Sequence, residues 1–294
     1  MSWYPTEATG VCLKQSLRNN ATYEDFTCVY PTLGKTYFDW EFPSHGAANV
    51  LTFMENNNWL PILTVALYAL AIFAGQKYMA NQPAWDWRYR LAAWNLFLAV
   101  FSAAGFFRMA PHLLHNLWHY DFKTNVCTDG LTLAGFGPTA YWGLIFAWSK
   151  FFELFDTFFI VVRKKKLMFL HWYHHITVLL CCWHTVVSKT PAGFIFSVVN
   201  YGVHMVMYFY YFLMAIRCKP KWFNPQVITV AQILQMVVGV SVCVRAYSWA
   251  SEDGCHASAT NIKGTLLMYA SYLYLFCEFF FKRYMITTKR TKTA

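Results

Sequence analysis

Hydrophobic residues in this sequence gather into seven long runs that are separated by short polar connections. A helix needs about 20 mostly apolar residues to cross the hydrocarbon core of a bilayer, and each run has roughly that length. The pattern therefore predicts an all-α integral membrane protein with seven transmembrane helices. The predicted spans cover residues 59–76, 91–111, 138–161, 167–187, 192–215, 225–248 and 262–281.

The same pattern divides the chain into three parts. Residues 1–58 form a polar segment, which we expect to be lumenal, and it lacks an apolar run suited to a cleavable signal peptide. Two cysteines of this segment, Cys12 and Cys28, are candidates for a disulfide. Residues 59–281 hold the predicted spans, and residues 282–294 form a basic tail.

The composition agrees with a membrane protein. Hydrophobic residues make up 57% of the chain and charged residues only 13%, which is typical of a membrane domain. The net charge is +10, and because acids outnumber cations in residues 1–58, all of this excess lies in the membrane part. The charge is thus explained by membrane topology, and we expect no nucleic acid partner.

Lysines and arginines are concentrated on one side of the predicted bundle, whereas the connections on the other side carry only Lys123 and Lys189. The positive-inside rule places the cation-rich side in the cytosol. With seven spans, the N-terminus is then lumenal and the C-terminus cytosolic. The fifteen residues of the cation-rich side are Lys77, Arg88, Arg90, Arg163, Lys164, Lys165, Lys166, Arg217, Lys219, Lys221, Lys282, Arg283, Lys289, Arg290 and Lys292.

Further features agree with this orientation. The sequence Asn-Ala-Thr at Asn20 is an N-glycosylation acceptor, which is used only on the lumenal side. Cys127 and Cys255 lie in two predicted lumenal loops, where a disulfide can persist. The tail carries Lys292 and Arg290 near its end and resembles a dilysine-type retrieval signal, which predicts residence in the endoplasmic reticulum membrane.

Three histidines lie inside the predicted span 167–187, in the sequence HWYHH. A helix rises 1.5 Å per residue, so His171, His174 and His175 lie roughly 8–14 Å beyond the preceding lysine run. Their spacing of i, i+3 and i+4 places all three on one helix face. The sequence therefore predicts an imidazole cluster in the cytosolic half of the bundle.

Three further spans carry polar faces at a similar depth, in the sequences KFFELFDT, NYGVHMVMYFYY and TVAQILQ. Ionisable side chains are rare inside membranes and usually face a cavity, so the faces together predict one polar chamber reached from the cytosol. The alternative is hydrogen bonding that only holds the helices together. The residues concerned are Lys150, Glu153, Asp156, Asn200, His204, Tyr208, Tyr211, Gln232 and Gln235.

The imidazole cluster allows two kinds of chemistry. The first is metal binding, because an HxxHH box also occurs in membrane di-iron desaturases and hydroxylases. Against a many-histidine metal site, four other histidines fall at the lumenal end, although a mononuclear site with Glu153 or Asp156 stays open. The second is acid–base or nucleophilic catalysis, because a neutral imidazole is available at pH 7 and can accept an acyl group. The four lumenal histidines are His112, His115, His119 and His184.

Taken in order, KFFELFDT, HWYHH, NYGVHMVMYFYY and TVAQILQ resemble the motifs of the fatty acid elongase family, the 3-ketoacyl-CoA synthases of the endoplasmic reticulum. The resemblance covers roughly residues 59–294, and the HWYHH box is most similar to the branch that acts on saturated and monounsaturated chains. It implies that six spans ring an acyl tunnel and that the first span lies outside. It also implies a lumenal disulfide between Cys127 and Cys255.

The resemblance implies condensation of a long-chain acyl-CoA with malonyl-CoA to 3-ketoacyl-CoA, CoA and CO2. His174 would take the acyl group, His204 would assist by proton transfer or by holding a malonyl oxygen, and His171 and His175 would orient the rings and the substrate. Hydrogen bonds and substrate contacts would come from Lys150, Glu153, Asp156, Asn200, Tyr208, Tyr211, Gln232 and Gln235. The lysine run Lys164, Lys165 and Lys166 either follows the positive-inside rule alone or attracts the CoA phosphates.

The resemblance also bears on cofactors and partners. It implies no metal, no NADPH and no other cofactor in this step. The expected partners are acyl-CoA, malonyl-CoA, membrane lipid and the ketoreductase, dehydratase and enoyl reductase of the elongation cycle, and a homodimer stays open. A further alternative is a seven-span receptor with a glycosylated outer N-terminus. Its ligand pocket would open to the lumen or exterior, whereas the polar faces here lie in the cytosolic half.

Overall fold

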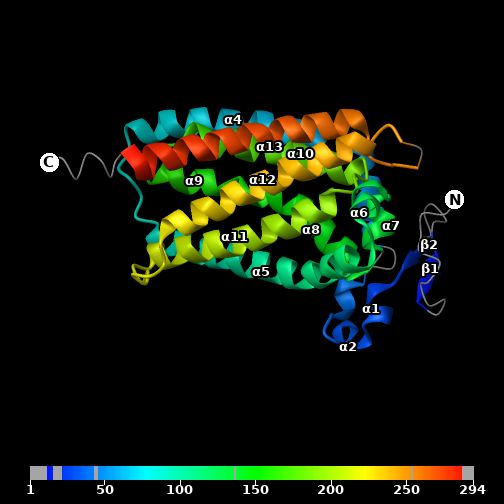
Figure 1. Ribbon diagram of the computed structural model, residues 1–294. Helices are drawn as coiled ribbons and strands as arrows, with labels where there is room; N and C mark the ends of the chain where they lie inside the picture. The colour runs from blue at the N-terminus through cyan, green and yellow to red at the C-terminus, as the bar shows by residue number, and fades with distance from the viewer. Residues whose placement is uncertain (1–11, 16–21, 43–45, 136, 253, 287–294) are drawn as a thin grey trace.

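The computed structural model describes residues 12–15, 22–42, 46–135, 137–252 and 254–286. Its long helices lie side by side as one bundle (Figure 1). They are α4 (Trp59–Ala80), α5 (Arg88–His119), α8 (Pro138–Glu153), α9 (Phe155–Val162), α10 (Phe169–Val187), α11 (Gly193–Ala215), α12 (Pro225–Trp249) and α13 (Ala259–Phe280), which continues into the π-helical turn η2 (Phe281–Ile286).

Shorter elements gather mainly at one end of this bundle. Two antiparallel strands pair Leu13 with Glu24 and Gln15 with Thr22. The short elements are β1 (Leu13–Gln15), β2 (Thr22–Glu24), α1 (Phe26–Val29), α2 (Pro31–Gly34), η1 (Asp39–Glu41), α3 (Gly46–Asn56), α6 (Phe122–Cys127) and α7 (Gly130–Ala134). The predicted glycosylation site at Asn20 and the tail cations Arg290 and Lys292 lie outside the described residues.

Each of the seven predicted runs coincides with a helix or a helix pair. By length and hydropathy, four described helices can cross a membrane: α4, α5, α12 and α13 together with η2. The run 138–161 is divided into α8 and α9, each of which is too short to be such a helix, and α10 and α11 contain histidines and other polar residues of the predicted chamber. Two bounds differ from the prediction: the run 138–161 is broken at Leu154 into α8 and α9, and α5 continues past Pro111 to His119.

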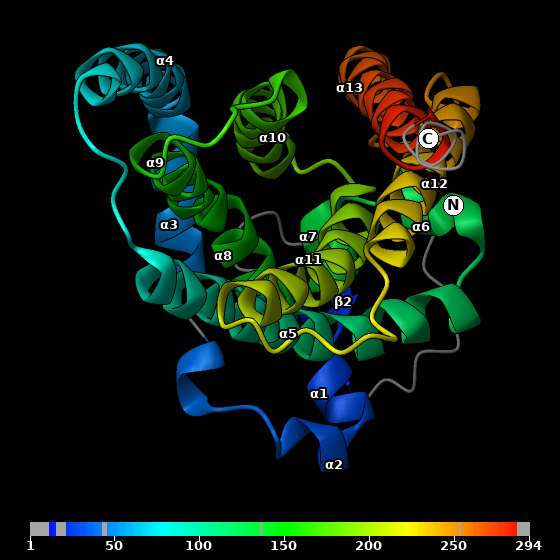
Figure 2. The ribbon, with the colours of Figure 1, turned by 90° about the vertical axis from the view of Figure 1, so that its left-hand side faces the viewer.

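Seen along the bundle axis, the long helices other than α4 follow one another around a common centre (Figure 2). The order of neighbours is α8–α9, α10, α13, α12, α11 and α5, and α5 then contacts α8 again. Helix α4 lies outside this ring and packs against α9. Exposed apolar side chains on α4, such as Leu70 and Phe73 at 63% and 69% exposure, give this helix a surface suited to lipid.

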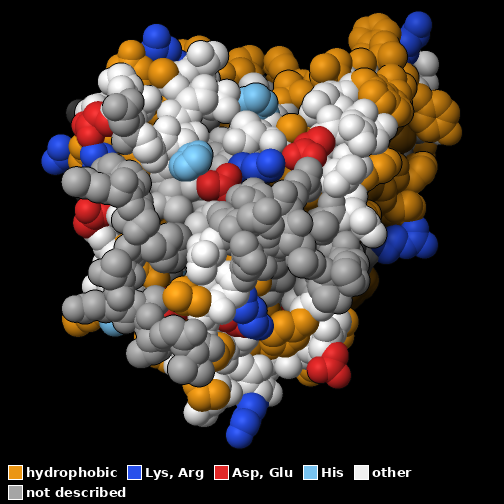
Figure 3. Space-filling view, turned by 90° about the vertical axis from the view of Figure 1, so that its right-hand side faces the viewer, with side chains coloured by type: hydrophobic (Ala, Val, Ile, Leu, Met, Phe, Trp, Pro, Cys, Tyr) orange, Lys and Arg blue, Asp and Glu red, His pale blue; other side chains and the backbone are white. Residues whose placement is uncertain are grey.

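The two ends of the bundle differ in chemistry. One end, here called the basic end, carries several arginines. Arg163 directly follows α9, and Arg217 lies just after α11. Arg88 donates from Nε to the Ala215 carbonyl at 2.5 Å. At the other end, here called the disulfide end, the sulfur atoms of Cys127 and Cys255 lie 2.09 Å apart. Polar and charged side chains are mixed over the disulfide end, and hydrophobic side chains gather on its flank (Figure 3).

The N-terminal elements dock on the disulfide end. Cys12 and Cys28 form a second disulfide, and Asp25 caps α1 by accepting from the Thr27 and Cys28 N–H groups. Glu41 of η1 is fully buried. Its Oε1 atom lies 2.9 Å from Arg108 Nε on α5 and accepts a hydrogen bond from Trp142 Nε1 on α8 at 2.6 Å. The part of residues 1–58 that the structure describes is therefore anchored on α5 and α8.

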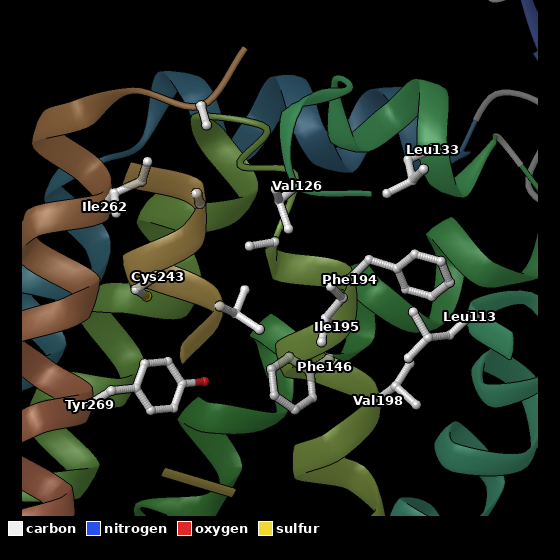
Figure 4. Packing of buried hydrophobic residues seen from close by; sticks show 14 of the residues in the cluster. Leu113, Val126, Leu133, Phe146, Phe194, Ile195, Val198, Cys243, Ile262 and Tyr269 are labelled. Atoms are coloured by element: carbon white, nitrogen blue, oxygen red, sulfur yellow. The ribbon is translucent and has the colours of Figure 1, made fainter. Parts of the chain in front are cut away.

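Buried apolar side chains fill the disulfide half of the bundle (Figure 4). Phe146 of α8, Phe194 of α11 and Tyr269 of α13 belong to one cluster there. Close helix contacts shape this half, because a Cβ atom at Gly105 would lie 2.4 Å from the Tyr201 ring, well inside van der Waals contact. Glycine at this position therefore lets α5 and α11 pack against each other directly.

Replacing Glu41 by alanine should lower the free energy of unfolding by about 2–4 kcal/mol, because the Arg108 guanidinium and the Trp142 N–H lose their shared acceptor. Glu278→Ala is the matched control, since it removes an ion pair to Lys282 that is largely exposed. Because solvent screens this pair, the change should have little effect on stability. Thermal unfolding of both purified variants in detergent tests this, and equal losses would contradict the anchoring role of Glu41.

Candidate active site

Two neighbouring cavities lie inside the ring of helices. The larger, here called the polar chamber, has a volume of about 640 Å³ and lies toward the basic end. The smaller, here called the apolar pocket, has a volume of about 140 Å³ and extends toward the disulfide end. Both cavities are lined by the same four residues where they meet: His174, Asn200, Gln235 and Met236.

Most of the predicted polar residues line the polar chamber. Helical spacing brings the three histidines of α10 to one face, and the five other helices of the ring supply the remaining walls. The predicted site residues that line it are Glu153, Asp156, Lys165, His171, His174, His175, Asn200, His204, Tyr208, Tyr211, Gln232 and Gln235. The structure therefore brings together side chains that are far apart in the sequence.

A buried ion pair on α8 is hydrogen-bonded to α11 beside the chamber. Lys150 is only 2% exposed, and its Nζ atom lies 2.7 Å from Glu153 Oε1 and 3.1 Å from Asn200 Oδ1. Ser149 Oγ also donates to Glu153 Oε1, at 3.2 Å, and His204 Nδ1 lies 3.8 Å from the same oxygen. Because a buried ammonium is costly without acceptors, this set fixes the Glu153 carboxylate next to His204.

Asp156 fixes a second junction, between α5, α9 and α11. Its Oδ1 atom accepts from Trp94 Nε1 at 2.6 Å, and its Oδ2 atom accepts from the Tyr208 hydroxyl at 2.7 Å. The break at Leu154 separates Glu153 from Asp156, so that the two carboxylates have different partners. Tyr208 in turn packs edge-on against His204, with 5.4 Å between the ring centroids.

His171 is held from the side of α4. Its Nε2 atom is 2.9 Å from Thr157 Oγ1, and Thr157 Oγ1 is 2.6 Å from the Tyr68 hydroxyl. The rings of His171 and His175 lie 4.4 Å apart. The outer helix α4 therefore reaches the histidine cluster through a chain of two hydrogen bonds.

His174 occupies the junction of the two cavities and faces the α13 side of the ring. Its ring lies 5.0 Å from the Tyr272 ring and 5.6 Å from the His175 ring. The Tyr272 hydroxyl donates to the His174 carbonyl at 3.3 Å. This histidine is therefore placed where one molecule could extend into both the polar chamber and the apolar pocket.

Two buried polar atoms of the chamber walls have no hydrogen-bond partner among the described residues: Glu153 Oε2 and His175 Nδ1. A buried acceptor or donor without a partner costs roughly 1–3 kcal/mol. Both atoms are themselves buried, so they add to the cost of keeping polar groups in this part of the bundle. Among the described residues, no group of three His, Cys, Asp or Glu side chains lies close enough together to hold a metal ion.

The sequence matches the model of the GNS1/SUR4 (ELO) family over residues 53–293. The chain belongs to the ELO family. It is 40% identical over 262 residues to very long chain fatty acid elongase 6 of Gallus gallus, which covers 89% of this chain and 97% of the relative. It is 39% identical over 264 residues to the Homo sapiens protein of the same name, covering 90% and 97%. The Drosophila melanogaster relative is 42% identical over 235 residues, covering 79% and 74%.

The predicted family resemblance is confirmed by these comparisons. The ELO family is a membrane family, and together with the long apolar helices this makes the chain a multi-pass membrane protein. The prediction of an all-helical membrane protein is therefore confirmed, whereas the number of seven spans stays a prediction.

The three lysines of the predicted run do not all line the polar chamber. Lys165 lines the polar chamber, but Lys164 donates to the carbonyls of Ala80 and Gln82, and Lys166 is not among the lining residues. The cause is the tight turn after α9, where Lys164 has a φ of 52° and points back to the end of α4. Arg163, the first residue of the same cation run, lines the chamber as well.

Thr157 belongs to the polar face predicted in KFFELFDT, and the structure adds its contact with His171. Sequence reasoning missed several other contributors. Tyr68, Trp94 and Asn95 come from spans whose patterns are otherwise apolar, and Tyr284 comes from η2. Only the packing of separate helices brings these side chains to the site, so no local pattern could identify them.

Asp156→Ala should destabilise the protein by about 2–4 kcal/mol, because the Trp94 N–H and the Tyr208 hydroxyl both lose their acceptor. Asp156→Asn is the matched control. Its carbonyl oxygen can accept from Trp94 while its NH2 group donates to the Tyr208 oxygen, since a hydroxyl can act as donor or acceptor. The asparagine variant should therefore lose less than about 1 kcal/mol. Thermal unfolding that shows equal losses would mean that the carboxylate charge, rather than its hydrogen bonds, holds the junction.

Proposed function

We propose that this protein catalyses the condensing step of fatty acid elongation, in which a long-chain acyl-CoA and malonyl-CoA yield 3-ketoacyl-CoA, CoA and CO2. Membership of the ELO family and the names of the relatives support a role in fatty acid elongation. The observation that carries the specific reaction is the position of His174 where the polar chamber meets the apolar pocket.

The two cavities match the two halves of an acyl-CoA. The apolar pocket suits a hydrocarbon chain, because its walls include Leu144, Val178 and Phe196. The polar chamber suits the polar CoA portion, and its lining includes the cations Arg163 and Lys165 near the basic end. A thioester bound across the junction has its carbonyl carbon beside His174.

In the first half-reaction, a ring nitrogen of His174 attacks the thioester carbonyl carbon. The carbon–sulfur bond breaks, and the acyl group stays on the imidazole. CoA leaves as the thiolate and takes up the proton that the imidazole gives up. Tyr272 and His175 flank the His174 ring and limit its orientation.

In the second half-reaction, malonyl-CoA occupies the polar chamber. Its carboxylate leaves as CO2, and the electron pair of the broken carbon–carbon bond forms the new bond to the acyl carbon. The bond between that carbon and His174 then breaks, and a proton taken up from water through the polar chamber restores the neutral His174 imidazole. His204, held beside Glu153, stabilises the enolate oxygen by donating a proton or a hydrogen bond, while His171 and His175 orient the reacting groups.

The proposal extends to placement in the cell. Seven spans cross the endoplasmic reticulum membrane, the basic end faces the cytosol in accordance with the positive-inside rule, and the disulfide end faces the lumen. Six spans then surround the acyl tunnel, and α4 is the outer one. CoA substrates enter from the cytosol, and the product passes to the ketoreductase of the elongation cycle. The step uses no metal or redox cofactor.

His174→Ala should abolish formation of the acyl-enzyme, while His184→Ala, at the other end of the same helix and hydrogen-bonded to Asn261, should leave it intact. Purified protein is mixed with a saturated long-chain acyl-CoA in the absence of malonyl-CoA. Free CoA and the intact protein mass are then measured. The wild type and His184→Ala should release about one CoA per protein and gain one acyl mass, because each protein has one nucleophile.

A second variant separates the half-reactions. His204→Ala should still release CoA from acyl-CoA but should lose at least about 100-fold in 3-ketoacyl-CoA formation, the usual scale for a general acid–base group. Acylation of the His174→Ala variant would overturn the role of His174. Normal 3-ketoacyl-CoA formation without any acyl-enzyme would replace the two-step route by direct condensation.

A further inference from the structure

Helix α3 occupies a groove between α8 and α10 on the outside of the ring. Two of its side chains are buried there, with exposures of 2% for Leu51 and 0% for Met54. Met54 packs in one cluster with Ala147 of α8 and Trp183 of α10. This short helix precedes the first predicted span, yet it is packed as tightly as the ring helices.

Polar contacts fix the rotation and height of α3. Asn58, directly after the helix, accepts a hydrogen bond from Trp183 Nε1 at 3.1 Å. Glu55 Oε1 lies 3.6 Å from Nζ of Lys189, in the turn between α10 and α11. Because these contacts lie close to Leu51 along the chain, the face of α3 that carries Leu51 is held toward the ring.

Leu51 lines the apolar pocket together with Leu144 of α8 and Val186 of α10. Of the described residues that line this pocket, it is the only one that precedes α5. Val186 lies twelve residues beyond His174 on α10, which corresponds to roughly 18 Å along the helix axis. Leu51 therefore lies at the far part of the pocket, well away from the proposed nucleophile.

The end of the pocket lies just beyond this level. Lys189 and Thr190 line it one helical turn past Val186, and the Gly130 N–H at the start of α7 donates to the Lys189 carbonyl at 3.2 Å. A Cβ atom at Gly130 would lie 3.1 Å from that carbonyl oxygen, so the two segments are in direct contact. Leu51 lines the same pocket and lies on the helix that contacts Lys189 and Trp183, so an acyl chain that fills this part of the pocket meets the Leu51 side chain.

From this placement we propose that Leu51 is a specificity-determining residue, which selects acyl chains by limiting the room in the last part of the apolar pocket. The inference rests on the proposed function, because it takes the pocket to hold the acyl chain. Only chains long enough to reach the level of Val186 meet this side chain. Substitutions at Leu51 should therefore leave shorter substrates unaffected and change the turnover of longer ones.

The test uses full-length purified protein and a homologous series of saturated acyl-CoAs with malonyl-CoA, and kcat/KM is measured for each chain length. Leu51→Ala should raise kcat/KM for the longest accepted chains relative to the shorter ones by about 10-fold, the lower end of the scale for one methylene group in an apolar pocket. Leu51→Phe should shift the preference toward shorter chains. The opposite directions exclude a general loss of stability as the cause.

Met54→Ala is the matched control, because Met54 is buried on the same helix but does not line the pocket. It should lower thermal stability at least as much as Leu51→Ala and leave the chain-length profile unchanged. Identical profiles for wild type, Leu51→Ala and Leu51→Phe would overturn the inference, as would an equal shift in Met54→Ala. Failure of the wild type to condense any acyl-CoA of the series would instead overturn the proposed function.

Discussion

A buried cation sets the main constraint on this structure. Lys150 is almost fully buried inside a bundle whose outer surface is apolar, and an ammonium group in such surroundings needs acceptors at hydrogen-bond distance. Glu153 and Asn200 supply them, at 2.7 and 3.1 Å. Meeting this requirement draws α8 and α11 together through the hydrogen bond from Lys150 to Asn200. The second carboxylate oxygen of Glu153 is buried without a partner among the described residues.

Other buried polar groups of the site also need hydrogen-bond partners. Asp156 accepts from Trp94 and Tyr208, and Thr157 connects Tyr68 to His171, so that five helices hold the site through polar contacts. In a bilayer, water is not available to replace a lost partner, which makes each of these contacts a condition for the bundle as well as for the chemistry. The outer helix α4 takes part through Tyr68, although it lies outside the ring.

How much of the structure the sequence could predict depends on how far apart in the sequence the interacting residues lie. The face that carries His171, His174 and His175 follows from helical spacing alone, because these residues lie on one helix. The break at Leu154 and the hydrogen bond from Lys164 to the end of α4 depend on contacts between separate elements. The sequence pattern indicated neither of them. The contributions of Tyr68, Trp94 and Leu51 were missed for the same reason. The buried anchoring of Glu41 was likewise beyond a pattern that marks residues 1–58 only as polar.

The division of the site into two cavities separates two properties that evolution can adjust independently. The groups proposed for the chemistry lie in the polar chamber and depend on one another, so that a change in Glu153 also disturbs Lys150 and the surroundings of His204. The far part of the apolar pocket has no such dependence, because its walls are packed side chains such as Leu51 and Val186. Cavity shape there can change by single apolar substitutions at moderate cost in stability. The family match begins at residue 53, inside α3, so Leu51 lies just outside the matched region. Because Leu51 forms part of the wall of the apolar pocket, a substitution there can change substrate preference and leave the polar chamber unchanged.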